Sequence, residues 1–325
     1  MLKVITFGET MLRLSPPNHQ LLAQAQSVEM HVGGSESNVA VGLARLGIEV
    51  AWFSSLPDNP LGRYVERAIH TQGVDTSHVH WSDQARLGTY WVETGAVPRP
   101  SKVIYDRSQT AISQISPDDI PDGLFARNVQ GILHLSGITP ALSDTAHHTT
   151  RHLAERAKRA GWRISFDLNY RAKLWDYTAA HDGCAPLLQL ADIIFAPYRD
   201  IQHVFQIEGT PETTFSQFHT RYAQATLVMT MGSEGAFAAS PEHDPVHILA
   251  YNTTAIDRIG AGDAFVAGFL SQVVEQGTHV DLTRALRWAN ACAALKYTLP
   301  GDMPLLNRAE VLALINQPDQ QHIQR

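Results

Sequence analysis

The chain has 325 residues, of which 44% are hydrophobic and 18% charged, and its formal net charge is −7. This composition excludes a disordered protein, and the negative balance without a long basic run disfavours nucleic acid or an anionic membrane as the partner. The apolar runs are shorter than the roughly 18 residues of a membrane span, and the two cysteines are far apart. We therefore expect a cytoplasmic globular protein without a disulfide framework or a structural zinc site.

The first part of the chain alternates between strand and helix patterns. A short apolar run at residues 4–7 predicts a buried strand, and helical spacing over 37–46 ends at a glycine. A second strand is predicted at 50–54 and a second helix at 61–72, again followed by a glycine. This alternation predicts a mainly parallel sheet with helices on both faces.

Two segments interrupt the alternation. Residues 89–93 and 102–105 are rich in β-prone side chains and flank a stretch with glycine and prolines, which predicts a hairpin outside the main sheet. Residues 10–31 also lack helical periodicity. We expect residues 10–31 and 85–110 to form a small antiparallel β lid.

The strand and helix patterns return after the hairpin. Strands are predicted at 131–135, 163–167, 193–196 and 227–230, and helices at 144–160, 264–277 and 282–297. The fold class is therefore α/β, an open mainly parallel sheet with helices on both faces plus the small lid. We assign 1–9, 32–84 and 111–317 to the α/β domain, 10–31 and 85–110 to the lid, and 318–325 to a polar, frayed tail.

The strongest chemical signal is the segment 257–265, with the sequence DRIGAGDAF. Gly260 and Gly262 permit a tight turn that leads directly into a helical pattern. The unpaired amides and the positive dipole end of the helix make an anion site suited to the terminal phosphate of ATP. Asp263 can accept the proton of an attacking sugar hydroxyl. The alternative interpretation is a glycine-rich helix start with Asp263 as an ordinary cap.

Four segments, in this order along the chain, resemble the ribokinase-like (PfkB) family of carbohydrate kinases. They are Gly8-Glu9 after the first strand, HVGGSESNVA at 31–40, MGSEGA at 231–236 and DRIGAGDAFVAGF at 257–269. With the closing segment around residue 302, the resemblance covers nearly the whole chain. It implies an ATP-dependent sugar kinase with ATP and Mg²⁺ as cofactors.

The resemblance also implies roles for individual residues. Asp263 would be the catalytic base, beside an anion hole formed by Gly260, Ala261 and Gly262. The floor of the sugar site would contain Gly33, Gly34 and Asn38. The nucleotide would lie against Gly232, Ser233 and Gly235, with Asn290 near the adenine. For Asn290 an ordinary polar position on a helix is an equal alternative.

Three residues depart from the family's usual pattern. Ile259 stands where the family has threonine, which bears on contacts to the nucleotide or to a monovalent cation. The usual Asn-x-x-Glu that organises magnesium is replaced by Pro197 and Asp200. We expect Asp200 to act on Mg²⁺ through water, with the ATP phosphates holding most of the ion.

A second set of residues indicates the substrate. Arg171 follows a predicted strand, at the sheet edge where open α/β folds bind ligands. Arg107 and Tyr105 end the lid hairpin and Tyr90 lies on its first strand. Two guanidinium groups suit a carboxylate, because each binds it in a fork. With Gly34, these residues resemble the substrate contacts of 2-keto-3-deoxygluconate kinases within the family.

The expected reaction is therefore phosphorylation of 2-keto-3-deoxygluconate to 2-keto-3-deoxy-6-phosphogluconate. The alternative for Arg107 and Arg171 is ordinary salt bridging or contact with ATP. A fructokinase or another sugar or nucleoside kinase of the family stays open, as does a non-catalytic sugar-binding regulator. The chain has no P-loop sequence and no GxGxxG after a strand, and a solvated helix face is favoured over a metal site for His148 and His152. Because a lid exposes strand edges, we expect a homodimer formed through the lids.

Overall fold

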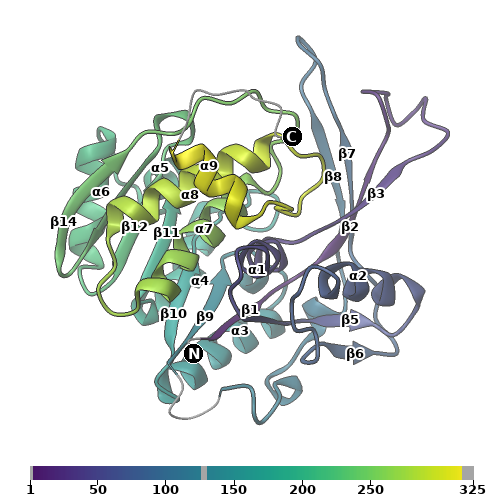
Figure 1. Cartoon of the computed structure of the whole chain (residues 1–325). Coiled ribbons are helices and arrows are strands. Elements are labelled where there is room, and N and C mark those ends of the chain that lie inside the picture. Colours follow the sequence, from purple (N-terminus) through teal and green to yellow (C-terminus); the bar gives the residue numbers. More distant parts are fainter. Residues whose placement is uncertain (1–2, 126–129, 317–325) are drawn as a thin grey trace.

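The computed structural model describes residues 3–125 and 130–316, so the predicted tail at 318–325 lies outside the described residues. The main sheet has eight strands in the order β14-β13-β12-β11-β10-β9-β1-β4, and Figure 1 shows it at the centre of the larger body. Pairing is parallel from β4 to β12 and antiparallel at β13 and β14. The strands are β1 (Lys3–Phe7), β4 (Val50–Phe53), β9 (Gly131–Ser136), β10 (Arg163–Asp167), β11 (Ile193–Pro197), β12 (Thr226–Thr230), β13 (Ala236–Ser240) and β14 (His243–Ile248).

Helices cover both faces of the main sheet, as the alternating pattern predicted. Because both faces are covered, strands such as β9 are buried along their whole length. One apolar cluster joins the sheet to α3 (Asp144–Arg159), α4 (Tyr177–Leu190), α5 (Tyr198–Phe205) and α6 (Pro211–Arg221). The other joins it to α1 (Ser35–Arg45), α2 (Pro60–His70), α7 (Ala261–Gln276) and α8 (Leu282–Tyr297), while α9 (Arg308–Asn316) packs on α8. The predicted α/β class is confirmed.

Local sequence explains where several helices begin. Asn59 caps α2 by accepting hydrogen bonds from the amides of Leu61 and Gly62 at 3.0 and 3.1 Å, and Pro60 occupies the first helical position. Ser143 caps α3 in the same way, accepting from the amide of Ala146 at 3.0 Å. Among the described residues, 3–125 and 130–316, no helix is both long and apolar enough to cross a membrane.

The separate small sheet is confirmed, and its strands are β3 (Glu29–Gly33), β2 (Met11–Ser15), β7 (Thr89–Glu93) and β8 (Lys102–Asp106) in that order. We call these four strands the lid sheet. The pairs β2–β3 and β7–β8 are antiparallel, as predicted, but β2 pairs with β7 in parallel, and β3 extends to Gly33, two residues beyond the predicted lid segment. A further pair, β5 (Ser55–Pro57) and β6 (His80–Ser82), was not predicted. Figure 1 shows β7 and β8 projecting from the main body.

Candidate active site

Two neighbouring cavities lie at the carboxyl ends of the parallel strands. The first has a volume of about 430 Å³ and lies between the main sheet, the start of α7 and the lid sheet. Every residue predicted for the sugar side lines it: Gly33, Gly34, Asn38, Tyr90, Tyr105, Arg107, Arg171 and Asp263, together with Gly260 and Gly262. The second cavity, of about 540 Å³, is lined by all the predicted nucleotide residues except Gly260, namely Gly232, Ser233, Gly235, Ala261, Gly262 and Asn290.

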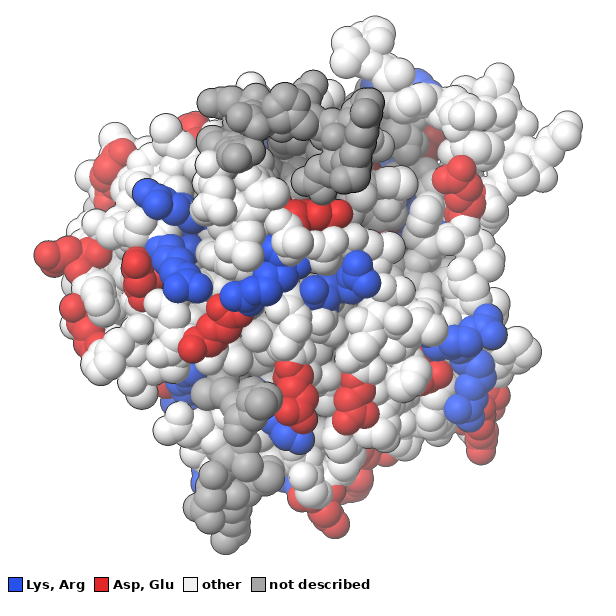
Figure 2. All heavy atoms as spheres, in the orientation of Figure 1, with Lys and Arg blue, Asp and Glu red and all other residues white. Residues whose placement is uncertain are grey.

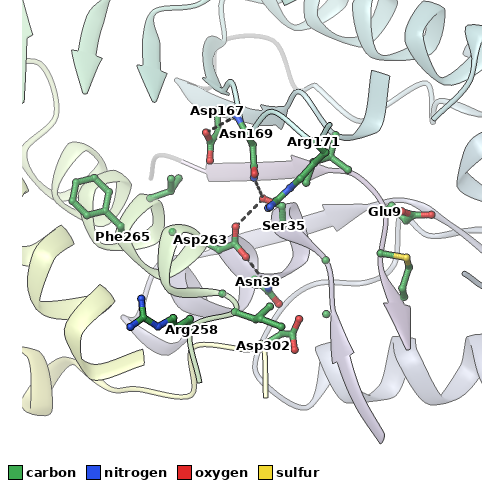
Figure 3. A pocket seen from close by; sticks show the side chains of 18 of the residues that line it. Glu9, Ser35, Asn38, Asp167, Asn169, Arg171, Arg258, Asp263, Phe265 and Asp302 are labelled. Atoms are coloured by element: carbon green, nitrogen blue, oxygen red, sulfur yellow. Dashed lines mark hydrogen bonds between the residues drawn. The ribbon is translucent and has the colours of Figure 1, made fainter. Parts of the chain in front are cut away.

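Asp263 is the central carboxylate of the first cavity. It lies in the first turn of α7 and is 8% exposed. Its Oδ1 accepts a hydrogen bond from Ser35 Oγ at 2.8 Å, and its Oδ2 accepts one from Asn38 Nδ2 at 2.7 Å (Figure 3). Burial raises the pKa of Asp263 above its ordinary value, and the two hydrogen bonds counteract that rise. The carboxylate is therefore held in one orientation at the mouth of the helix.

The turn before α7 has the geometry of an anion site. Gly260 is the N-cap residue with φ +85°, and the first intrahelical bond runs from the amide of Ala264 to its carbonyl at 2.9 Å. The amides of the first turn therefore have no partners within the helix. A Cβ on Gly260 would approach the carbonyl oxygen of Asp302 to 2.0 Å. Only glycine satisfies both the left-handed φ and this close approach.

The glycines at the end of β3 let the lid sheet and α1 approach the main sheet closely. A Cβ on Gly34 would lie 2.0 Å from the carbonyl oxygen of Glu9, and one on Gly33 would lie 2.6 Å from Tyr90 Oη. Asn38 was predicted to lie on the floor of the sugar site, and its amide nitrogen donates there to Asp263. Its Oδ1 is buried without a hydrogen-bond partner among the described residues, so it remains available as an acceptor.

The two predicted arginines have different surroundings. Arg107 forms an ion pair with the buried Glu9, while its Nε is buried and has no hydrogen-bond partner among the described residues. The guanidinium of Arg171 forms neither a hydrogen bond nor a salt bridge with any residue in the described ranges, and the carboxylates of Asp167, Asp200 and Asp263 interact with it only at longer range. Tyr105 and Tyr90 stack with their ring centroids 5.8 Å apart. The cavity thus offers an unpaired guanidinium and a free guanidinium N–H opposite the carboxylate of Asp263.

Sequence reasoning missed a buried network beside the cavity. Arg13 of β2 donates from Nη1 to Asp257 Oδ2 at 2.6 Å and to Asp302 Oδ1 at 3.0 Å. The other oxygen of Asp302 accepts a hydrogen bond from Tyr90. Asp302 lies in the closing segment that carried part of the family resemblance, which was the only signal for it. The network joins the lid sheet to both ends of the α7–α8 hairpin.

The second cavity contains glycines in left-handed conformations. Gly232 has φ +63° and Gly235 has φ +90°, and a Cβ on Gly235 would lie 2.0 Å from the carbonyl oxygen of Ile248. Asn290 donates to the carbonyls of Ile248 and Leu249, both at 3.2 Å. It therefore fixes the chain that follows β14 while lining the cavity, which combines the two interpretations that the sequence left open.

Asp200, the predicted indirect Mg²⁺ contact, lies outside both cavities. Its Oδ2 accepts a hydrogen bond from the amide of Tyr170 at 3.1 Å. Burial raises its pKa to about 6. No cluster of three or more His, Cys, Asp or Glu that could hold a metal occurs within the described ranges. The residues present therefore fit a Mg²⁺ ion that is held by the ATP phosphates and water, with Asp200 reaching it only through water.

Comparison with known proteins identifies the family. A model of the pfkB family of carbohydrate kinases matches residues 1–308. The chain is 41% identical over 320 residues to a 2-dehydro-3-deoxygalactonokinase of Haloferax volcanii, covering 98% of each chain. The chain therefore belongs to the pfkB family of carbohydrate kinases. As in that family, it is an ATP-dependent sugar kinase.

Two solved structures are also similar. The crystal structure of a 2-dehydro-3-deoxygluconokinase from Thermotoga maritima superposes with a TM-score of 0.89 and 32% identity, covering 97% of this chain and 98% of that one. A fructokinase from Vibrio cholerae, solved with fructose, ADP and potassium ion, superposes with a TM-score of 0.84 and 28% identity, covering 97% and 98%. The predicted family and fold are confirmed by these matches.

Proposed function

We propose that the chain phosphorylates a 2-keto-3-deoxy sugar acid, converting 2-keto-3-deoxygluconate to 2-keto-3-deoxy-6-phosphogluconate. The observation that carries this proposal is the unpaired Arg171 guanidinium in the same cavity as Asp263. An arginine without a partner favours a substrate carboxylate, because the two groups form paired charge-assisted hydrogen bonds. The buried, unpartnered Nε–H of Arg107 would be a second donor, although the charge of Arg107 is balanced in part by Glu9.

The reaction follows from the arrangement of the two cavities. Asp263 takes the proton from the C6 hydroxyl, whose oxygen forms a bond to the γ-phosphorus while the bond to the bridging oxygen breaks. ADP leaves with that electron pair. The amides of Ala261 and Gly262 face the migrating phosphoryl group. Mg²⁺ bound with ATP would neutralise phosphate charge, and Asp200 would be its indirect protein contact; a monovalent cation, like the potassium ion of the Vibrio structure, is a further expected cofactor.

The identity of the sugar acid is the finer part of the proposal. The Haloferax relative, at 41% identity, is named for the galacto acid, and the Thermotoga structure for the gluco acid. 2-Keto-3-deoxygalactonate is therefore the second candidate substrate, and fructose the third. A non-catalytic sugar-binding role is disfavoured, because Asp263 and the turn before it keep the geometry that phosphoryl transfer needs.

A coupled assay for ADP over these three substrates, ribose and a nucleoside tests the proposal. We expect turnover of a sugar acid, and Arg171→Met should raise its KM about 10–100-fold, the effect of losing a charged hydrogen bond. Arg159→Met is the matched control, because Arg159 is an exposed arginine at the end of α3 that lines neither cavity. Phosphorylation of fructose or ribose with no turnover of either sugar acid would overturn the proposal.

We also propose that residues 10–31 and 85–110 act as a lid over the α/β domain of 1–9, 32–84 and 111–317, and that two lids pair in a homodimer. Large apolar side chains are exposed on the lid sheet, with Met30 47% and Ile104 53% exposed. Burying them in a dimer would remove that surface from water. Sedimentation velocity of wild type and Ile104→Asp tests this: a monomeric wild type would contradict the pairing.

A further inference from the structure

The first and second cavities are adjacent. Four residues line both of them: Thr230, Arg258, Gly262 and Phe265. Arg258 alone among these four carries a charge. The described residues that line the second cavity include no other Lys, Arg, Asp or Glu. A triphosphate in that cavity would therefore have a single charged side chain to meet it.

Arg258 is free to take a ligand. It forms no hydrogen bond or ion pair with any residue of the described ranges, whereas its neighbour Asp257 is bonded to Arg13 and to the amides of Ile259 and Gly301. In Figure 3 the side chain of Arg258 extends beside the start of α7, with its guanidinium directed away from Asp302. Its backbone is fixed by its neighbour, and its charge is not used within the chain.

The chemistry of the reaction favours a positively charged group at the junction of the two cavities. The phosphoryl group must move from the second cavity to the first, and negative charge spreads over its three outer oxygens as it moves. Among the described residues no cluster of three or more His, Cys, Asp or Glu could hold Mg²⁺ at this junction, and Asp200 lines neither cavity. A guanidinium at the junction presents several N–H donors in one plane. It can therefore donate to more than one phosphoryl oxygen and also offset their negative charge.

We propose that Arg258 is a catalytic residue that binds the terminal phosphates of ATP and stabilises the phosphoryl group while it passes from the second cavity to the first. This inference rests on the proposed kinase reaction and adds a residue that the family resemblance does not assign. Arg258 neither gives up nor takes a proton. Its positive charge offsets the negative charge on the phosphoryl oxygens while the bond to ADP breaks and the bond to the substrate oxygen forms.

Arg258→Ala and Arg258→Lys test the proposal. Arg258→Ala should lower kcat about 10²–10³-fold, as removal of one transition-state donor does, and Arg258→Lys should keep part of the activity. ATP affinity, measured calorimetrically without sugar, should fall about 10–100-fold in Arg258→Ala. AMP affinity should not change, because AMP lacks the terminal phosphates. Added guanidinium chloride should restore part of the turnover, and equal ionic strength from sodium chloride should not.

Arg287→Ala is the matched control. Arg287 is an exposed arginine of α8 that lines neither cavity. Its replacement removes the same charge and should leave kcat and the ratio of ATP to AMP affinity unchanged, and added guanidinium chloride should not raise its turnover. The proposal is overturned if Arg258→Ala keeps kcat within threefold of wild type, or if it weakens ATP and AMP equally. If wild type phosphorylates no sugar at all, the proposed function fails, but the ATP and AMP titrations still decide whether Arg258 meets the terminal phosphates.

Discussion

Arg13 of the lid sheet and Asp257 of the turn before α7 form a buried ion pair across 244 residues of sequence, with 2.6 Å between Nη1 and Oδ2. The side chain of Arg13 is 5% exposed and that of Asp257 12%. Asp257 Oδ1 also accepts the amide of Ile259 at 3.1 Å, so the same carboxylate holds the anion-site turn. This pair, together with the bonds of Arg13 and Tyr90 to Asp302, therefore joins the lid sheet to the phosphate side of the site.

The first prediction concerns this pair. Arg13→Met should lower the free energy of unfolding by about 3–5 kcal/mol, because it leaves Asp257 and Asp302 buried without their cation. Urea denaturation monitored by circular dichroism measures the loss. Arg86→Met breaks the exposed Arg86–Asp106 pair beside the lid sheet and should cost at most about 1 kcal/mol. Equal losses in the two variants would show that burial of the Arg13 pair contributes nothing.

The second prediction concerns the base. Asp263→Asn should lower kcat about 10²–10⁴-fold while the fold and ATP affinity are kept, since the amide cannot take the hydroxyl proton. Asp144→Asn is the control, because Asp144 has a comparable place in the first turn of α3 and lines neither cavity. Turnover of Asp263→Asn within about tenfold of wild type would remove the general-base role.

The pH profile offers an independent check on the same residue. Because burial raises the pKa of Asp263, the base becomes protonated at a higher pH than an ordinary aspartate, whose pKa is about 3.9. kcat/KM should therefore decline as the pH falls through that raised value. The decline reflects protonation of Asp263 in the folded enzyme and does not depend on the pKa of the unfolded chain. A flat acid limb down to about pH 4 would contradict the environment described for Asp263.

The third prediction concerns Glu36, which is fully buried on α1. Its Oε1 accepts from Ser136 and Thr139 at 2.7 and 3.0 Å, and its Oε2 has no partner among the described residues. Burial raises its pKa from 4.5 to about 7. The folded state therefore keeps a proton that the unfolded state loses, and stability falls as the pH rises from 4.5 to 7, by about 3 kcal/mol at 1.36 kcal/mol per pH unit.

Glu36→Gln cannot ionise and should remove this decline. Denaturation at pH 5 and pH 8 should show the variant gaining up to about 3 kcal/mol relative to wild type between the two conditions. Glu208→Gln, at an exposed position on the loop before α6, should show no such gain. The assignment is wrong if wild type and Glu36→Gln change in parallel with pH.

The fourth prediction compares the two glycines that bound α7. Gly260 and Gly277 both have positive φ, +85° and +74°, but a Cβ on Gly277 meets nothing within 4 Å. Gly277→Ala should cost about 1–2 kcal/mol of stability from backbone strain alone and leave kcat unchanged. Gly260→Ala should also displace the Asp302 carbonyl and lower kcat at least about tenfold. Equal kinetic behaviour of the two variants would contradict the close approach at Gly260.

The sequence predicted the elements whose periodicity was clear. Most strands of the parallel region and α1, α2, α3, α7 and α8 lie where their patterns indicated, although α7 begins three residues earlier, at Ala261. The missed elements lack such patterns. Helix α4 contains Gly183 and Pro186, both helix breakers in isolation, and β14 is an edge strand that contains Pro245 and three polar residues beside Val246 and Ile248. Tertiary packing, not local preference, determines these segments.

In the candidate site, too, residues with a local sequence pattern were predicted and residues that depend on tertiary contacts were missed. Glycines and Asp263 were visible because tight turns and an anion site require particular residue types in sequence. Asp302, Arg13 and Arg258 are ordinary charged residues locally, and their surroundings depend on chain segments far away in sequence. Ile259, which stands where the family has threonine, lies against Met11, Tyr90 and Val92 of the lid sheet. That contact requires the folded lid sheet, so no local sequence pattern could predict it.

The hydrogen bonds from Ser35 and Asn38 to Asp263 join parts of the chain that are 228 and 225 residues apart. A ribosome therefore completes the sugar floor long before it supplies the carboxylate that must face it. Nascent chains that end before residue 263 have no base and no anion site, whatever strands they have already paired. Until residue 263 has been added, the growing polypeptide thus cannot transfer phosphate by this route.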